Sequence, residues 1–166
     1  MRQVWKPSVT AAAIIERDGH FLLVEEHTLE GLRLNNPAGH LEPGESPVQA
    51  AVREALEETC CAFTPDGLVG VYLSRFQRPG EDVTYLRFAF RGSIGGPIAG
   101  CRLDDNIVRT VWLTPGEIRE SQARHRSPLV LQCVEDHLAG KCYPLDLVMT
   151  HPSVQALQGA NNQTAL

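Results

Sequence analysis

The most informative segment of the chain runs from Gly39 to Glu58 and reads GHLEPGESPVQAAVREALEE. Its centre carries the best-marked helix start in the chain, because Ser46 suits the N-cap, Pro47 suits the first helical position and Gln49 completes a capping box. Good helix formers continue to residue 59. We therefore predict a helix after Ser46, preceded by a functional loop over residues 33–46, which are rich in Asn, Pro and Gly.

Three carboxylates lie on one face of this predicted helix. Glu54, Glu57 and Glu58 are related by i+3 and i+4 spacings, so they repel one another by about 0.2–0.5 kcal/mol per pair and oppose the helix dipole. A hard divalent cation such as magnesium would offset the repulsion. Arg53, four residues before Glu57, can orient that carboxylate. The alternative is an ordinary solvated face on which Arg53 is only a helix partner.

The whole array resembles the Nudix box: Gly, five residues, Glu, seven residues, Arg-Glu, an aliphatic residue, one residue, Glu-Glu. The chain matches every fixed charged position and the leading glycine, with Gly39, Glu45, Arg53, Glu54, Glu57 and Glu58. Two positions depart from the pattern. Ala55 is a small version of the aliphatic residue, and Cys60 stands where the family has glycine. That glycine serves as a left-handed helix cap, so Cys60 either costs about 1 kcal/mol or changes the helix ending.

The resemblance extends from the first expected strand to about residue 147. Three flanking motifs are similar to the NudJ-type subgroup of bacterial Nudix phosphatases: Asn36-Pro-Ala-Gly-His-Leu-Glu42, Arg126-Ser-Pro-Leu-Val130 and Tyr143-Pro-Leu145. The subgroup implies hydrolysis of nucleoside tri- and diphosphates and of thiamine-pathway pyrophosphates, with release of orthophosphate. The family implies an α/β fold, the Nudix α/β/α sandwich with a mixed β-sheet. We assign residues 1–150 to this domain and residues 151–166 to a polar, flexible tail.

The rest of the chain fits a mixed sheet. Apolar runs over residues 9–16 and 21–26 flank Asp18-Gly19 and predict a hairpin, and further strands are expected over residues 68–76, 84–91 and 107–113. The glycine-rich residues 92–100 should form a flexible connection. A second capping box at residues 114–117 opens a short helix, and a third helix follows Ser127-Pro128 and ends near residue 140. This irregular alternation favours a sandwich over a doubly wound sheet.

Composition narrows the class of protein. The 166 residues are enough for one domain, and 43% of them are hydrophobic. A formal net charge of −5 argues against a nucleic acid polymer as partner, and no apolar run reaches membrane-spanning length. The odd count of five cysteines favours reduced, buried thiols over a disulfide framework. We therefore expect a cytoplasmic protein, monomeric or homodimeric, with a small-molecule phosphate-anhydride substrate.

The resemblance implies a metal site made by the Gly39 carbonyl with Glu54, Glu57 and Glu58, which would hold magnesium, with manganese as the alternative. Arg53, Glu57 and Glu58 are the expected catalytic residues of the box. The general base is either Asp105 or its neighbour Asp104, which precede the last strand, or a box carboxylate. The other interpretation of Asp104-Asp105-Asn106 is turn chemistry after a glycine-rich loop.

Two arginines are candidates for substrate binding. Arg87 lies on the strand face opposite Leu86 and could point into a cleft to bind a phosphate, or could be a solvated edge residue. Arg126 precedes a helix N-terminus, where exposed backbone N–H groups favour anions, or is an ordinary surface arginine. His40 and His125 are expected to be structural or solvent-exposed. The aromatic residues that could stack on a substrate ring, or belong to the core, are Trp5, Phe76 and Tyr85.

Two alternatives to the phosphatase remain open. A Nudix enzyme could instead cut ADP-ribose or a dinucleoside polyphosphate internally. The chain could also be a non-catalytic Nudix module that senses a nucleotide, although such modules usually lose box carboxylates and this chain keeps all of them.

Overall fold

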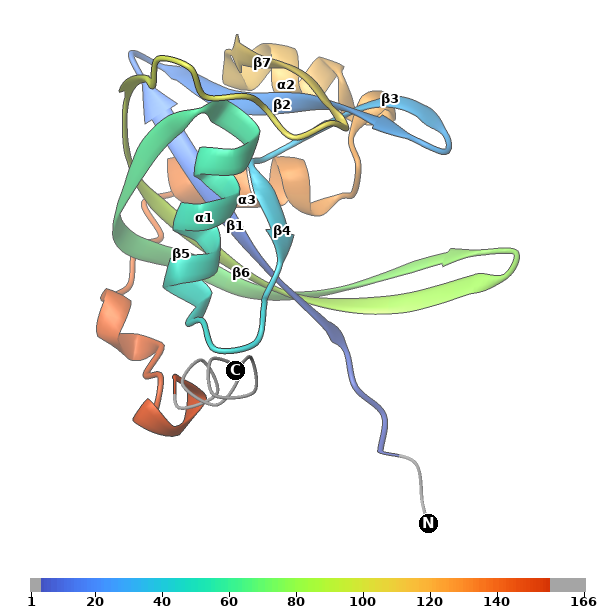
Figure 1. Cartoon of the computed structure of the whole chain (residues 1–166). Helices are drawn as coiled ribbons and strands as arrows, with labels where there is room; N and C mark the ends of the chain where they lie inside the picture. The colour runs from blue at the N-terminus through green and yellow to red at the C-terminus, as the bar shows by residue number, and fades with distance from the viewer. Residues whose placement is uncertain (1–3, 156–166) are drawn as a thin grey trace.

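The computed structural model describes residues 4–155 and contains a mixed sheet of seven strands with helices on both faces (Figure 1). The strands are β1 (Ser8–Arg17), β2 (His20–Thr28), β3 (Gly31–Asn35), β4 (Ala38–His40), β5 (Cys61–Arg78), β6 (Glu81–Pro97) and β7 (Ile107–Leu113). The helices are α1 (Pro47–Thr59), α2 (Pro115–Glu120) and α3 (Leu129–Leu138), with 3-10 turns η1 (Gln122–Arg124), η2 (Leu145–Leu147) and η3 (Pro152–Val154). The predicted Nudix α/β/α sandwich with a mixed sheet is confirmed.

The strand order is β3-β2-β1-β6-β5, with β4 paired to β1 and β7 paired to β2. Strands β1 and β6 run parallel from Ser8↔Tyr85 to Ile15↔Gly92, and the other pairs are antiparallel. Strands β1 and β2 pair only next to their turn, at Glu16↔Phe21 and Arg17↔His20. Beyond these pairs the two strands diverge, so β1 continues with β4 and β6 whereas β2 continues with β3 and β7.

Each face of the sheet has its own apolar core. Helix α1 packs Ala50, Ala51 and Ala55 against the sheet, where Phe63 and Phe90 are fully or almost fully buried. The small alanine side chains let α1 lie close to β1 and β5. On the other face, α2 and α3 bury an apolar cluster against β1, β2 and β5. All three helices are therefore fixed by the burial of apolar surface, which is the main stabilising term in folding.

Local sequence signals correctly predicted the start of α1 and the turn between β1 and β2. The capping box of α1 is present, since the Gln49 backbone N–H donates to Ser46 Oγ at 3.1 Å and the Ser46 N–H donates to Gln49 Oε1 at 2.8 Å. Asp18 and Gly19 both have positive φ, 50° and 75°, as a type I′ hairpin turn requires. These features depend on neighbouring residues, so the sequence is sufficient to predict them.

Two expected loops are partly strand. The segment 33–46 includes the end of β3 and the short strand β4, which pairs with β1 at Thr10↔His40 and Ala12↔Ala38. The glycine-rich segment 92–100 continues β6 as far as Pro97. At Gly92 a Cβ would lie 2.1 Å from the Thr64 carbonyl oxygen, so glycine is needed there for close strand approach rather than for flexibility. Tertiary pairing overrides the local composition in both segments.

The expectation of reduced, buried cysteines is wrong for Cys60 and Cys101. They form a disulfide with a Cα–Cα distance of 5.6 Å across 41 positions of sequence. Cys61, Cys133 and Cys142 have free thiols, and of these Cys133 is buried while Cys142 is exposed. The pair was invisible in the sequence because only folding brings the end of α1 next to residue 101, within the distance that a disulfide can bridge.

The end of the chain is described as far as residue 155. The turn η3 lies inside the segment expected to form a tail, and residues 156–166 lie outside the described residues. Within residues 4–155, no helix is long and apolar enough to cross a membrane.

Candidate active site

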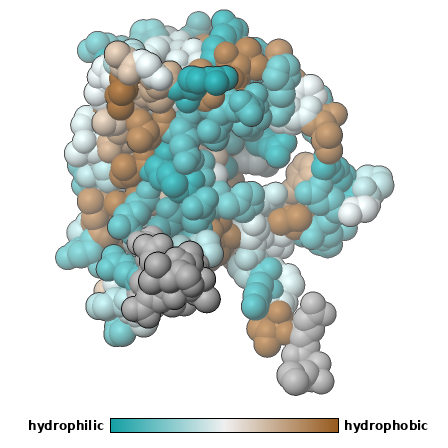
Figure 2. Space-filling view, in the orientation of Figure 1, coloured by the Kyte–Doolittle hydropathy of each residue, from teal (hydrophilic) through white to brown (hydrophobic). Residues whose placement is uncertain are grey.

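A cleft of about 1240 Å³ opens between α1, the β5–β6 hairpin and the start of α3. The hairpin extends well beyond the sheet, and Phe76 and Tyr85 on it line the cleft (Figure 1). The loop before α1 and the segments around residues 104–106 and 125–132 complete the wall. Hydrophilic side chains gather over α1 and β4 on the face shown in Figure 2. A cleft of this size and polarity suits a charged small molecule.

Arg53 is the centre of the box. Its Nε and Nη2 donate to Glu45 Oε2 and Oε1 at 3.1 and 2.8 Å, and its Nη1 donates to Glu54 at 2.7 Å and to Glu57 at 2.9 Å. Its Nη2 also donates to the His40 carbonyl at 2.9 Å. Hydrogen bonding to Glu45 is the main cause of a pKa for Arg53 that lies even above the usual range. Arg53 therefore ties the loop to the helix and orients Glu57, as its spacing predicted.

Two box carboxylates are buried. Glu54 is 8% and Glu58 5% exposed, and burial raises both pKa values. For Glu58 the pKa is raised to about 8, even though the Ala38 backbone N–H donates to its carboxylate at 2.9 Å. The negative charges of Glu26, Glu54 and Asp104 add to the increase. Such carboxylates are costly to ionise unless a positive charge lies beside them.

Gly39 lies against the Glu54 carboxylate. A Cβ at this position would lie 2.1 Å from both the carboxyl carbon and Oε1 of Glu54, so any other residue here would displace this carboxylate. Backbone and carboxylate oxygens are the donors that magnesium prefers. Among residues 4–155, no three acidic, His or Cys side chains already form a metal cage. Arg53 Nη1 donates to both Glu54 and Glu57. The donor set fits a hard cation that completes its coordination with water and substrate oxygens.

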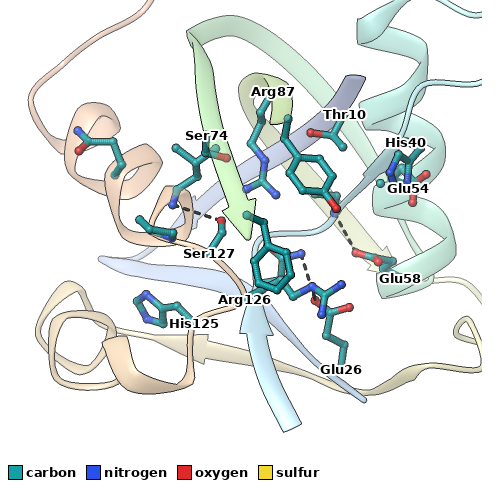
Figure 3. A pocket seen from close by; sticks show the side chains of 18 of the residues that line it. Thr10, Glu26, His40, Glu54, Glu58, Ser74, Arg87, His125, Arg126 and Ser127 are labelled. Atoms are coloured by element: carbon teal, nitrogen blue, oxygen red, sulfur yellow. Dashed lines mark hydrogen bonds and ion pairs between the residues drawn. The ribbon is translucent and has the colours of Figure 1, made fainter. Parts of the chain in front are cut away.

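Arg87 points into the pocket, between Glu58 on one side and Ser127 on the other (Figure 3). It is only 7% exposed, yet its Nε and Nη1 have no hydrogen-bond partner, and its pairing residue on β1, Thr10, has an unpartnered hydroxyl. No carboxylate of the described chain lies within 4.0 Å of the guanidinium. Burial lowers its pKa. A buried cation without a counter-ion is expensive, so this site favours an anionic ligand.

The sequence analysis missed Glu26 as a residue of the site. It lies on β2, is 7% exposed, accepts a hydrogen bond from Asn35 Nδ2 at 3.2 Å and lies 3.8 Å from Arg126 Nε. Burial raises its pKa. The available signal was the pair Glu25-Glu26 at the end of an apolar run, where an acidic residue needs a reason to be buried.

Some of the remaining residues predicted for the site line the cleft, and others do not. Arg126, half-exposed, lines the cleft just before α3. Asp104 also lines it, and its backbone N–H donates to the Glu57 carbonyl at 3.1 Å. Asp105 is exposed and lies outside the lining residues, as does Trp5, which is 68% exposed. The cleft thus brings together Asp104 and Arg126 but not Asp105.

Comparison with known proteins gives one consistent result. The family model described as "NUDIX domain" matches residues 5–133. The chain is 35% identical over 146 residues to "Phosphatase NudJ" of Escherichia coli strain K12, covering 87% of this chain and 92% of that protein. It is 50% identical, with a TM-score of 0.82, to the solved structure of a "NUDIX hydrolase from Nitrosomonas europaea", over 88% of this chain and 98% of that one.

A more distant solved structure shares the fold alone. It is a bifunctional NMN adenylyltransferase/ADP ribose pyrophosphatase from Francisella tularensis, complexed with AMP and a manganese ion. The identity is 18% and the TM-score 0.62, over 81% of this chain and 42% of that one.

Proposed function

The chain belongs to the Nudix hydrolase family, whose members act on phosphate anhydrides, and from this we propose that it is a magnesium-dependent phosphatase. Its substrates would be nucleoside tri- and diphosphates and thiamine-type pyrophosphates, with orthophosphate as product. One observation carries the proposal: the carboxylates organised by Arg53 share a cleft with the buried guanidinium of Arg87, whose Nε and Nη1 have no hydrogen-bond partner. The cleft therefore offers oxygen donors for a cation and a separate cationic group for phosphate.

The metal ligands in this proposal are Glu54, Glu57 and Glu58 with the Gly39 carbonyl, and manganese is the alternative to magnesium. When bound, the ion supplies charge neutralisation at the phosphoryl oxygens and a water of lowered pKa. Arg53 holds Glu57 in place, so this carboxylate needs little reorganisation when substrate arrives.

Phosphate oxygens of the substrate would bind to Arg87, with Arg126 at the cleft mouth as the second contact. Arg87 is buried, so its contact with a phosphate is little screened by water, whereas Arg126 is half-exposed and contributes less. The Thr10 hydroxyl, also without a partner, can donate to the same oxygens. We therefore assign ground-state binding mainly to Arg87.

The general base is assigned to Asp104 instead of Asp105, because Asp104 lines the cleft beside the box helix. Glu57 or Glu58 is the alternative. The same proposal includes small-molecule substrates and a cytoplasmic location, with the protein acting as a monomer or homodimer. The formal net charge of −5 supports the exclusion of nucleic acid polymers.

The test is release of orthophosphate from nucleoside di- and triphosphates, thiamine pyrophosphate and ADP-ribose, with and without magnesium. The variant Glu57→Gln removes one proposed ligand with little change of shape, and Glu120→Gln, exposed on α2 outside the cleft, is the matched control. We expect magnesium-dependent phosphate release that Glu57→Gln abolishes and Glu120→Gln keeps. Turnover of ADP-ribose alone would favour the pyrophosphatase, and nucleotide binding without turnover would favour a sensor.

A further inference from the structure

The disulfide joins two parts of the cleft wall. Cys60 follows the last residue of α1, three positions after Glu57, and Cys101 lies three positions before Asp104. Two backbone hydrogen bonds run alongside it, from the Ile98 N–H to the Cys60 carbonyl at 2.8 Å and from the Asp104 N–H to the Glu57 carbonyl at 3.1 Å. The crosslink therefore attaches the loop that carries Asp104 to the end of the box helix.

Cys60 occupies a backbone position that suits glycine. Its φ of 54° and ψ of 28° are left-handed, and its N–H donates to the Leu56 carbonyl at 2.8 Å, so the helix ends as it would with a glycine cap. A side chain at such a position is unfavourable. Capping alone does not explain a cysteine here, but the bond to Cys101 does, because only a side chain can reach across to the loop.

Apart from the disulfide, the loop between β6 and β7 is attached at its two ends. Near β7, the Ile107 N–H donates to the Asp104 carbonyl at 2.9 Å, and the His27 N–H of β2 donates to the Asn106 carbonyl at 2.8 Å. Residues 99–102 and 104–106 are exposed, and at Gly100 the position that a Cβ would take has no neighbouring atom within 4 Å. Ile107, which follows the loop, is buried and fixes its far end. Without the disulfide, the two backbone hydrogen bonds alone would hold the start of the loop and Asp104 against α1. Partly exposed backbone bonds of this kind open readily.

We propose that the Cys60–Cys101 disulfide is a redox-sensitive positioning element that holds Asp104 at the cleft, so that the oxidised enzyme turns over faster than the reduced enzyme. This inference rests on the proposed function, and Cys60 and Cys101 act through Asp104 as positioning residues. Reduction by a small dithiol transfers two electrons and two protons to the S–S bond. It leaves two thiols on the protein and a disulfide in the reductant.

The two sulfurs differ in access, which suits a reversible bond. Cys101 is exposed, whereas Cys60 is 8% exposed, so an attacking thiolate reaches the bond from the loop side. In reducing compartments, disulfides that do form are usually transient or redox-sensing. The cytoplasmic location included in the proposed function therefore favours a switching role for this bond over a permanent crosslink.

The first experiment compares the oxidised protein with the same protein after treatment with a dithiol. Titration of thiols in denaturant should give three before and five after reduction. With magnesium and a nucleoside triphosphate as substrate, reduction should lower kcat on the order of tenfold and change KM less than about twofold, because a misplaced base slows the chemical step without removing a binding contact. Circular dichroism checks that the reduced protein stays folded.

Variants separate positioning from general stability. Cys60→Gly restores the cap that the backbone favours, and Cys101→Ser removes the other sulfur. Both variants should have the kcat of the reduced wild type, and dithiol treatment should not change it. Cys142→Ser removes an exposed free thiol outside the cleft and should keep the full response. In an Asp104→Asn background the response should disappear, which a merely structural crosslink would not cause.

Several results would overturn the inference. These are five thiols before reduction, equal kcat in both redox states, Cys101→Ser with the kcat of the oxidised wild type, or an undiminished response in Asp104→Asn. Absence of turnover in both states would overturn the proposed function and this inference together. The thiol titration would then still show whether the bond between α1 and the loop forms.

Discussion

Glu58→Gln should stabilise the metal-free protein at alkaline pH although it removes a proposed metal ligand. Glu58 is 5% exposed, and its pKa is raised by burial from 4.5 to about 8. The folded state therefore binds more protons than the unfolded state between these two values, and stability falls as pH rises through this window. Glutamine has the same shape, can still accept the hydrogen bond from the Ala38 N–H and carries no charge to desolvate.

The gap between the two pKa values sets a ceiling of roughly 5 kcal/mol on this cost. Between about pH 5.5 and about pH 8.5, the ionisation of Glu58 should remove about 3 kcal/mol from the free energy of unfolding of the wild type. Glu58→Gln lacks this loss, so its advantage over the wild type should grow by the same amount across the range. Bound magnesium should reverse the order, because it favours the charged carboxylate.

Urea unfolding of both proteins in a chelator, at the two pH values, measures the difference directly. Glu57→Gln is the matched control, since the Glu57 side chain is 40% exposed and bonded to Arg53. It should show no comparable gain. The reasoning is refuted if Glu58→Gln is no more stable than the wild type at the higher pH, or if its advantage is the same at both.

Three further variants test other parts of the site. Gly39→Ala places a Cβ 2.1 Å from the Glu54 carboxylate, so kcat should fall about 100-fold with an unchanged circular dichroism spectrum; near-normal kinetics would contradict the close approach. Arg87→Met should raise KM about 10- to 100-fold, while urea unfolding shows a ligand-free protein at least as stable as the wild type. Arg53→Lys replaces the fork that binds Glu45 with a point charge. It should lower the free energy of unfolding by about 2 kcal/mol and reduce kcat, and wild-type turnover would show that the fork is dispensable.

The box helix was predictable because its signals are local. Ser46, Pro47 and Gln49 act on backbone groups within one helical turn, and the i+3 and i+4 spacings alone place the box carboxylates on one face. For Cys60 the position in the box left two outcomes open, a left-handed cap with a side chain or a changed helix ending, and the structure has the left-handed cap. None of these inferences needs knowledge of a distant part of the chain.

Features that depend on distant partners were missed or left open. Strand β4 exists because β1 is available to pair with it, and Gly92 is in a strand because the Thr64 carbonyl lies against it. Glu26 looked like the end of an ordinary strand until the sheet placed it in the cleft. Asp104 lines the cleft and Asp105 does not, a difference that alternation along the chain does not encode.

The family, the box helix and the pairing of Arg53 with Glu57 could be predicted from consecutive residues, because short-range geometry and motif spacing are local properties. The tertiary structure alone decided that Arg87 is buried without a counter-ion, that Glu26 joins the site and that Cys60 meets Cys101. Each of these depends on how strands and loops far apart in sequence pack together. Burial and proximity are properties of that packing, and they set the charge balance of the cleft.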